Sequence, residues 1–101
     1  MSPNKKNTVE EEGVLTREVV VLNRYGTHAR PAALLVKAAA HFDCEIMIEK
    51  NGVQVNAKSI MGLLTLEGNN GATLQIHASG HDAKEALTAL AELFEKKFFE
   101  D

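Results

Sequence analysis

The sequence contains no tryptophan, one tyrosine, four phenylalanines and a single cysteine. Because Cys44 has no partner in the chain, an internal disulfide and a CxxC metal or redox motif are both excluded. Few aromatic rings and a net charge of −3 argue against nucleic-acid binding, which requires a basic surface and side chains that stack on bases. No apolar run reaches the roughly 20 residues that a membrane-spanning helix needs, so no membrane insertion is expected.

The length of 101 residues is enough for one domain with a modest core. The N-terminal residues lack the apolar segment of a secretory signal, which together with the single cysteine predicts a cytoplasmic protein. Residues 1–13 are polar, with two lysines followed by three consecutive glutamates, and they are predicted to form a mobile tail. The folded domain is therefore expected to span residues 14–101.

Hydrophobic periodicity predicts the element order β-α-β-β-α-β-α. Asn51-Gly52 is a strong hairpin signal between two strands, and Asp82 with Glu85 has the spacing of a capping box before the last helix. The order predicts an α+β domain of two layers, in which helices cover one face of a mainly antiparallel sheet. The strands are predicted at 16–23, 44–50, 53–57 and 72–80, and the helices at 29–42, 59–68 and 82–98.

The stretch YGTHARPAALLVKA, residues 25–38, begins a helix in an unusual way. Ser, Thr, Asn or Asp usually precedes the first helical turn, but here His28 occupies that place and Arg30 lies within the turn. The free N–H groups and macrodipole of a helix start favour anions, and the same positive field disfavours a charged imidazolium. Because a neutral imidazole is a nucleophile and a guanidinium suits phosphate oxygens, the pattern indicates a histidine that accepts a phosphoryl group.

Two plainer interpretations remain open at this level. His28 could be an ordinary loop histidine, and Arg30 an exposed side chain that slightly opposes the helix dipole. The other histidines, His41, His77 and His81, do not show the convergent ligand spacing of a zinc site. No metal site and no cofactor is therefore predicted.

A second, short helix follows Ser59, which is a suitable N-cap residue. Its apolar residues occupy nearly every face of a helix too short to be wholly buried. If Leu63 and Leu66 serve the core, three apolar residues face outward: Ile60, Met61 and Leu64. One side of the first helix adds small or long residues: Ala29, Ala33 and Lys37. Together they suggest a docking surface, although the first two outward residues could instead belong to the core.

Two segments, GTHARPAALLVKAA and NAKSIMGLLTL, closely resemble the histidine-containing phosphocarrier protein (HPr) family of the bacterial phosphotransferase system. They occur in the order and at the separation typical of the family, and the resemblance extends from residue 16 to about residue 98. It implies an open-faced β-sandwich with four antiparallel strands and three helices on one face. It also implies a stoichiometric phosphoryl carrier that is not itself an enzyme, acts as a monomer and needs no cofactor.

The resemblance further implies roles for individual residues. His28 would take a phosphoryl group on Nδ1 from enzyme I, which phosphoenolpyruvate charges, and pass it to enzyme IIA domains for sugar uptake and its regulation. Arg30 would hold the phosphoryl group together with N–H groups of the first turn. Ser59 matches a serine that an HPr kinase/phosphorylase modifies in many members. The partner-binding surface would comprise Thr27, Ala29, Ala33, Lys37, Ile60, Met61 and Leu64.

Some departures leave the branch of the system open. Thr27 stands where members usually carry an apolar residue. The C-terminal FFED is similar to the nitrogen-branch relative NPr, whereas KSIMGL is similar to sugar-branch proteins with serine regulation. The alternative function is therefore nitrogen-branch or purely regulatory signalling through Ser59 and His28.

Overall fold

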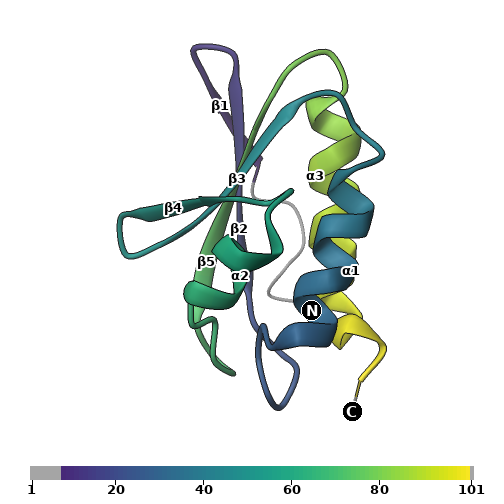
Figure 1. Cartoon of the computed structure of the whole chain (residues 1–101). Helices are drawn as coiled ribbons and strands as arrows, with labels where there is room; N and C mark the ends of the chain where they lie inside the picture. The colour runs from purple at the N-terminus through teal and green to yellow at the C-terminus, as the bar shows by residue number, and fades with distance from the viewer. Residues whose placement is uncertain (1–7, 101) are drawn as a thin grey trace.

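The computed structural model describes residues 8–100, which form a helix layer packed on a sheet (Figure 1). In chain order the elements are β1 (Thr8–Glu11), β2 (Val14–Val20), α1 (Ala29–Ala39), β3 (Glu45–Lys50), β4 (Val53–Asn56), α2 (Ile60–Thr65), β5 (Thr73–Ser79), α3 (Ala83–Glu95) and a 3₁₀ turn (Lys97–Phe99). None of the helices within residues 8–100 combines the length and the apolar character needed to cross a lipid bilayer.

The strands form one antiparallel sheet in the order β1-β2-β5-β3-β4. The helices cover one face of this sheet, with α1 and α3 side by side and α2 packed near β4 (Figure 1). Because each helix buries one stripe and the sheet buries one face, two layers close around a single core. The predicted α+β class, the open-faced sandwich and the three helices are confirmed.

The sheet has one strand more than the four expected from the sequence. Residues 8–13, which fall in the expected mobile tail, instead form β1 and its turn. Residues 1–7 of that expected tail lie outside the described residues. Glutamate-rich segments have low strand propensity, which is why the sequence pattern does not indicate β1.

The β1–β2 hairpin is closed by a tight turn. Val9 pairs with Thr16, and the turn residues Glu12 and Gly13 have φ values of 54° and 83°. Two consecutive positive φ values match a two-residue hairpin turn whose twist suits the strands it joins. At a sheet edge, the charged side chains of such a strand also oppose pairing with another sheet.

The core lies between the sheet and the helices. Leu63 and Leu66 are 1% and 6% exposed, as expected if they serve the core. Cys44 is also buried, and this burial, reinforced by a hydrogen bond to Asp82, raises the pKa of its thiol to about 11. The thiol is therefore protonated at neutral pH and acts as a small hydrophobe. The largest fully buried side chains are Phe94, Phe98, Leu35, Ile46, Ile48, Leu63, Leu74, Ile76, Leu87, Leu90, Val19 and Val21.

Asp82 precedes α3, but the predicted capping box with Glu85 is wrong, because the Asp82 side chain makes no capping hydrogen bond. Its two carboxylate oxygens accept the N–H groups of Asp43 at 2.8 Å and Cys44 at 2.9 Å. The bond from the Asp43 N–H is the main reason that the pKa of Asp82 is lowered. Asp82 therefore joins the segment between α1 and β3 to the start of α3. The two segments are far apart in the sequence and come close only in the folded chain.

His77 on β5 links three strands on the sheet face opposite the helices. Its Nδ1 lies 2.7 Å from Oγ1 of Thr16 on β2, and its Nε2 lies 2.7 Å from Oε1 of Glu49 on β3. The hydrogen bond from His77 is the main reason that the pKa of Glu49 lies below its ordinary range. The Glu49 carboxylate therefore stabilises the fold while it is ionised.

We expect Glu49→Gln to lower the free energy of unfolding by about 1 kcal/mol at pH 7, because a charge-assisted hydrogen bond is lost. Since the folded-state pKa of Glu49 is depressed, this contribution is present above the unfolded-state pKa and is lost as the pH falls through the folded-state value. The difference between parent and variant should therefore shrink below about pH 4. Urea unfolding at several pH values measures it.

The control is Glu18→Gln, because Glu18 is exposed on the same face of the sheet. That change should have little effect at any pH. A difference for Glu49→Gln that does not vary with pH would contradict the stabilising role of the Glu49 carboxylate.

Candidate functional site

His28 is the N-cap of α1, as the sequence predicts, and the helix begins at Ala29. Its side chain makes no capping hydrogen bond and is 41% exposed. The first turn carries no acidic residue, and the N–H groups of Ala29 and Arg30 have no intrahelical acceptor. Pro31 has no N–H to satisfy. An exposed helix start beside an imidazole is suited to binding an anion.

The loop before His28 is held by the segment that follows α2. The N–H of Thr27 donates to the Gly68 carbonyl at 2.9 Å, and the Thr27 hydroxyl accepts the Gly68 N–H at 3.1 Å. Gly26 has a φ of +69°, and a Cβ atom there would collide with the Gly68 carbonyl oxygen. Only glycine fits this close approach without strain.

Thr27 is only 7% exposed. Its side chain therefore offers little area to a partner, and the partner-binding role predicted for Thr27 stays a prediction. Its hydroxyl group accepts the Gly68 N–H, so this buried polar side chain has a hydrogen-bond partner. Thr27 fixes the geometry of the loop that presents His28.

Arg30 reaches the C-terminal segment of the chain. Its Nη1 donates to the carbonyl of Phe98 at 2.8 Å and lies 3.4 Å from Oε2 of Glu100. The same Glu100 oxygen lies 3.0 Å from Nε2 of His28. The two predicted site residues are thus brought together by the carboxylate of Glu100, to which the sequence pattern assigns no role at this site.

Glu100 also accepts a hydrogen bond from Nδ2 of Asn23 at 3.1 Å. Asn23 is fully buried, and its Nδ2 donates to the carbonyl of Gly26 at 2.6 Å as well. Burial alone would raise the pKa of Glu100, but the hydrogen bonds from Asn23, His28 and Arg30 outweigh it and lower the pKa. The carboxylate is therefore ionised at neutral pH and can only accept hydrogen bonds.

A left-handed turn carries Glu100 to this place. The expected helix reaches about residue 98, but α3 ends at Glu95, and the three residues of the 3₁₀ turn have φ values of 54°, 53° and 61°. Phe98 is fully buried and packs edge-to-face on Phe94, with 4.9 Å between the ring centroids. Ring burial offsets the cost of about 1–2 kcal/mol per left-handed residue. Because Phe94 and Phe98 also have helical spacing, nothing in the local sequence indicates the reversal.

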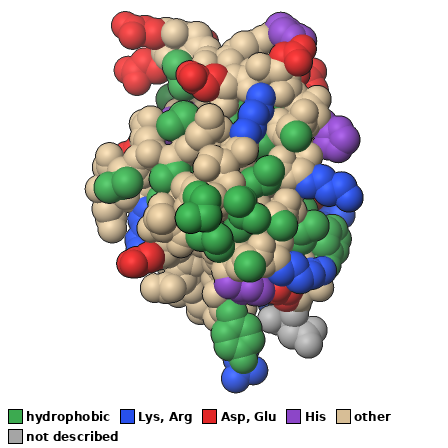
Figure 2. Space-filling model, in the orientation of Figure 1, with side chains coloured by type: hydrophobic (Ala, Val, Ile, Leu, Met, Phe, Trp, Pro, Cys, Tyr) green, Lys and Arg blue, Asp and Glu red, His purple; other side chains and the backbone are tan. Residues whose placement is uncertain are grey.

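The predicted outward-facing residues of α2 are exposed. Ile60, Met61 and Leu64 are 41%, 68% and 40% exposed, so the alternative that the first two belong to the core is wrong. Next to α2, α1 contributes three further exposed residues: Ala29, Ala33 and Lys37. These six residues define the α1–α2 surface. Figure 2 shows hydrophobic side chains gathered on this face, with lysine and arginine toward the α1 side.

Tyr25 is a further exposed residue near His28, and the sequence pattern predicts no role for it. Its side chain is 69% exposed, and its ring centroid lies 6.4 Å from that of His28 in an edge-on arrangement. The guanidinium of Arg24 lies 5.3 Å from the centre of the Tyr25 ring. The Tyr25 ring therefore places exposed apolar area next to the imidazole.

Ser59 caps α2 as predicted. Its Oγ accepts the N–H of Gly62 at 3.2 Å, and the residue is half-buried. Ile60 and Met61 follow it directly, so the hydroxyl lies at the border of the α1–α2 surface.

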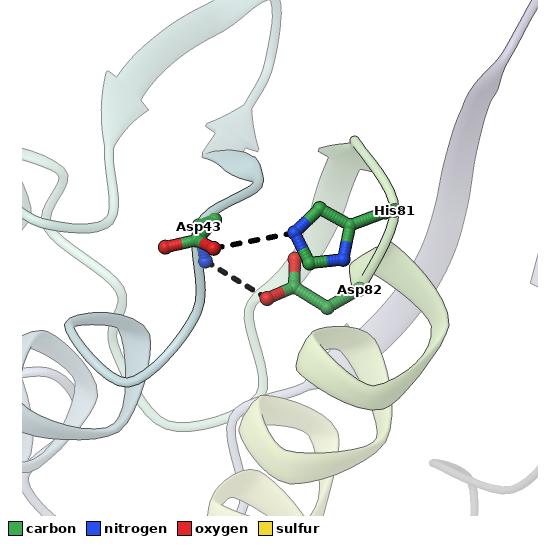
Figure 3. Close-up of side chains that lie close together, drawn as sticks. All are labelled: Asp43, His81 and Asp82. Carbon is green, nitrogen blue, oxygen red and sulfur yellow. Dashed lines mark hydrogen bonds and ion pairs between the residues drawn. The ribbon is translucent and has the colours of Figure 1, made fainter.

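Asp43, His81 and Asp82 form a cluster beyond the opposite end of α1 from His28 (Figure 3). One possible ligand atom from each lies within 4.8 Å of the others. Both Asp82 oxygens already accept backbone N–H groups, and Nε2 of His81 lies 3.2 Å from Oδ2 of Asp43. These hydrogen bonds explain why the three residues lie close together: they join the start of α3 to the segment after α1.

Comparison with known proteins relates this geometry to a family. A family model described as the PTS HPr component phosphorylation site matches residues 15–96. The chain belongs to the HPr family. It is 46% identical over 88 residues to phosphocarrier protein HPr of Treponema pallidum, a match that covers 87% of this chain and 100% of the relative.

Two further relatives agree with this membership. HPr-like protein Crh of Halalkalibacterium halodurans is 45% identical over 84 residues, covering 83% of this chain and 100% of the relative. The crystal structure of HPr-C-His from Thermoanaerobacter tengcongensis is similar with a TM-score of 0.82 and 43% identity, covering 85% of this chain and 97% of that chain. Both the sequence and the fold therefore support a phosphocarrier role in the phosphotransferase system (PTS).

The family model matches part of the described chain. It includes His28, Arg30 and Ser59. The strand β1 precedes the matched residues, and the left-handed turn with Glu100 follows them. The extra sheet edge and the carboxylate at His28 therefore lie outside the part of the chain that the family model describes.

We expect Lys97→Gly to leave stability unchanged or to raise it by up to about 1 kcal/mol, because glycine adopts positive φ without a side-chain penalty. Glu92→Gly, at an exposed position well inside α3, should cost about 0.5–1 kcal/mol. Urea or thermal unfolding of the two variants measures this contrast. Equal losses at both positions would show that the turn at Lys97 is not left-handed in solution.

Proposed function

We propose that His28 carries a phosphoryl group from phosphorylated enzyme I, charged by phosphoenolpyruvate, to enzyme IIA domains. The observation that carries this proposal is the exposed imidazole at the start of α1, which makes no capping hydrogen bond and shares Oε2 of Glu100 with the Arg30 guanidinium. A neutral ring nitrogen is a nucleophile, while the helix start and the guanidinium favour the anion that it would receive. Membership of the HPr family supports the same assignment.

The loading step balances without any further reactant. The lone pair of the acceptor ring nitrogen attacks the phosphorus of the donor's phosphoryl group, and an N–P bond forms. The donor's own bond to phosphorus breaks, and its electron pair leaves with the donor. Negative charge on the phosphoryl oxygens is stabilised by prepositioned donors, here Arg30 and the free N–H groups of the first turn.

Unloading reverses these steps with an acceptor group on the IIA domain. The chain returns to its starting form only when a partner takes the phosphoryl group. It therefore acts as a stoichiometric carrier and not as an enzyme with turnover of its own.

Enzyme I and the IIA domains are proposed to dock in turn on the α1–α2 surface. Its centre is apolar, because Ile60, Met61 and Leu64 are all at least 40% exposed, and its border carries basic residues such as Lys37. Exposed apolar side chains clustered beside a reactive group are typical of a protein-binding site. Because donor and acceptor would use the same surface, the carrier is proposed to act as a monomer.

Regulation through Ser59 is the second candidate function. The position of its hydroxyl at the border of the α1–α2 surface favours it, as does the similarity to HPr-like protein Crh. A kinase that phosphorylated Ser59 would add close to two negative charges there. The helix start would tolerate the phosphate, whereas a partner with an acidic surface would be repelled. The same chemistry would serve either a sugar branch or a nitrogen branch.

Incubation with enzyme I and phosphoenolpyruvate should add one phosphate to the parent chain, and acid should remove it, because an N–P bond is labile in acid whereas a serine phosphate is not. His28→Ala should gain none. His41→Ala, a change beyond the other end of α1, should be labelled like the parent. Mass spectrometry of the intact chain before and after acid treatment measures this, and equal labelling of His28→Ala would refute the assignment.

Met61→Glu should weaken binding to enzyme I by about tenfold or more, because a charge would be desolvated in an apolar interface. The melting temperature should change little, since the Met61 side chain is 68% exposed. Val9→Glu is the matched control, because Val9 is 62% exposed on the edge strand β1. Isothermal titration calorimetry and thermal unfolding measure the two quantities. Equal binding of both variants would place the docking surface elsewhere.

A further inference from the structure

A seven-residue strand, β2, lies inside the sheet only because β1 pairs with its outer side (Figure 1). Without β1, β2 would be the edge of the sheet, and its outward backbone N–H and C=O groups would have no strand beside them. The two edges that the described residues do form, β1 and β4, are only four residues long. Short edge strands are one means by which proteins limit pairing between sheets.

The strand β1 contributes almost nothing to the core. All four of its residues are exposed, and its one large apolar side chain, Val9, is 62% exposed. What β1 does contribute is backbone pairing, which runs from Thr8 opposite Arg17 to Glu11 opposite Val14. A strand that buries so little apolar area adds little hydrophobic stabilisation. Its main physical effect is therefore to satisfy the outer backbone groups of β2.

The side chains of β1 and β2 differ in how well each strand would pair with its own copy. β1 contains Glu10 and Glu11, and two such strands side by side would bring like charges together, which is destabilising. β2 reads VLTREVV, in which four of seven residues are aliphatic and the charges of one arginine and one glutamate cancel. Residues of this kind have high strand propensity. β1 therefore replaces an edge that would pair readily with one that repels its own copy.

The turn between the two strands makes the pairing of β1 local. Only Glu12 and Gly13 separate the strands, and Oε2 of Glu10 accepts the Gly13 N–H at 3.1 Å. A segment held by so short a connection has an effective concentration of about 1 mM or more at its partner. At a protein concentration of about 1 µM, a second copy would therefore compete for β2 at a disadvantage of roughly a thousandfold.

We propose that the outer edge of β2 is a strand-pairing site for a second copy of this chain, and that β1 occupies this site and so keeps the protein monomeric. When β1 is released, β2 of one copy pairs antiparallel with β2 of the other, and the two sheets join into one. The strand β1 precedes the residues that the family model matches, so this protection is an addition to the matched domain. The inference does not depend on the proposed function.

The first variant releases β1 in the full-length chain. Successive N–H groups along a strand point to opposite sides, so one of Val9 and Glu10 directs its N–H toward β2. The double change Val9→Pro/Glu10→Pro removes that donor whichever residue carries it. The control, Val9→Thr/Glu10→Gln, changes both side chains but keeps both N–H groups. Because the side chains of β1 are exposed, the core should stay intact in both, and thermal unfolding checks this.

A second variant releases β1 from the turn, without any change in either strand. Gly13 has a φ of +83°, and nothing lies within 4 Å of a Cβ atom placed there. Gly13→Val therefore causes no collision, but a β-branched residue at positive φ is strained. The control is Gly71→Val, because Gly71 has a φ of +89° and equally open surroundings in the loop before β5.

Size-exclusion chromatography with light scattering measures the mass of each chain from about 1 µM to about 1 mM, the range over which a second copy becomes competitive. The parent and both controls should stay at 11.0 kDa. The double proline variant should move toward twice that mass as the concentration rises. Gly13→Val should move in the same direction at higher concentrations, because β1 can still pair part of the time.

Hydrogen exchange shows which edge forms the dimer. The amides of residues 14–17 that face β1 should be protected in the parent. In the double proline variant they should exchange at least about tenfold faster at low concentration, because a local opening no longer has to occur first, and they should regain protection as the dimer forms. The amides of β2 that face β5 should stay protected throughout.

A double proline variant that exposes these edge amides and yet stays monomeric at the highest concentration would overturn the proposal. Edge amides that remain protected in the monomeric variant would do the same, since β1 would then not be what covers them. A dimer whose edge amides still exchange fast would place the interface elsewhere. Dimers of either control would show that destabilisation, and not the release of β1, drives association.

Discussion

The unsatisfied N–H groups at the start of α1 are the feature around which the site is arranged. A serine or aspartate at position 28 would satisfy one of them through its side chain, but the imidazole of His28 does not. An uncapped helix start costs stability unless water or an anion completes it. The rest of the domain supplies the rigidity that offsets this cost, because the loop before His28 is hydrogen-bonded to Gly68 and α1 packs against α2 and α3.

The shortness of α2 explains why the α1–α2 surface is apolar. A helix of six residues presents only one side to the core, and Leu63 takes that place at 1% exposed. The other apolar side chains of α2 do not reach the core between the sheet and the helices, so they stay in contact with water. That exposure is unfavourable for an isolated chain but becomes favourable when a partner covers it. The His28 imidazole and the apolar surface lie on the same face of the molecule because α1 and α2 are neighbours.

Much of the fold and part of the site could be predicted from the sequence. These are the features that depend on interactions between residues close together in the chain. The N-cap positions of His28 and Ser59 follow from residues a few positions away, and both are confirmed. The outward orientation of Ile60 and Met61 follows from counting the faces of a short helix. Predictions from local sequence rules were wrong where a side chain bonds to residues far away in the sequence. Asp82 has the spacing of a capping residue but accepts from backbone N–H groups of Asp43 and Cys44 instead.

Sequence alone determined the order of the elements from β2 to α3, the helix that starts on His28 and the presence of Arg30 in its first turn, since each of these depends on periodicity or on adjacent residues. Only the tertiary structure decided that Thr27 is buried, that residues 8–11 complete the sheet, and that the C-terminal segment reverses at Phe98. The physical reason is the same in each case. Edge pairing, burial of an aromatic ring and the hydrogen bonds of Glu100 join residues far apart in the chain, so their free energy appears only once the core has brought those segments together.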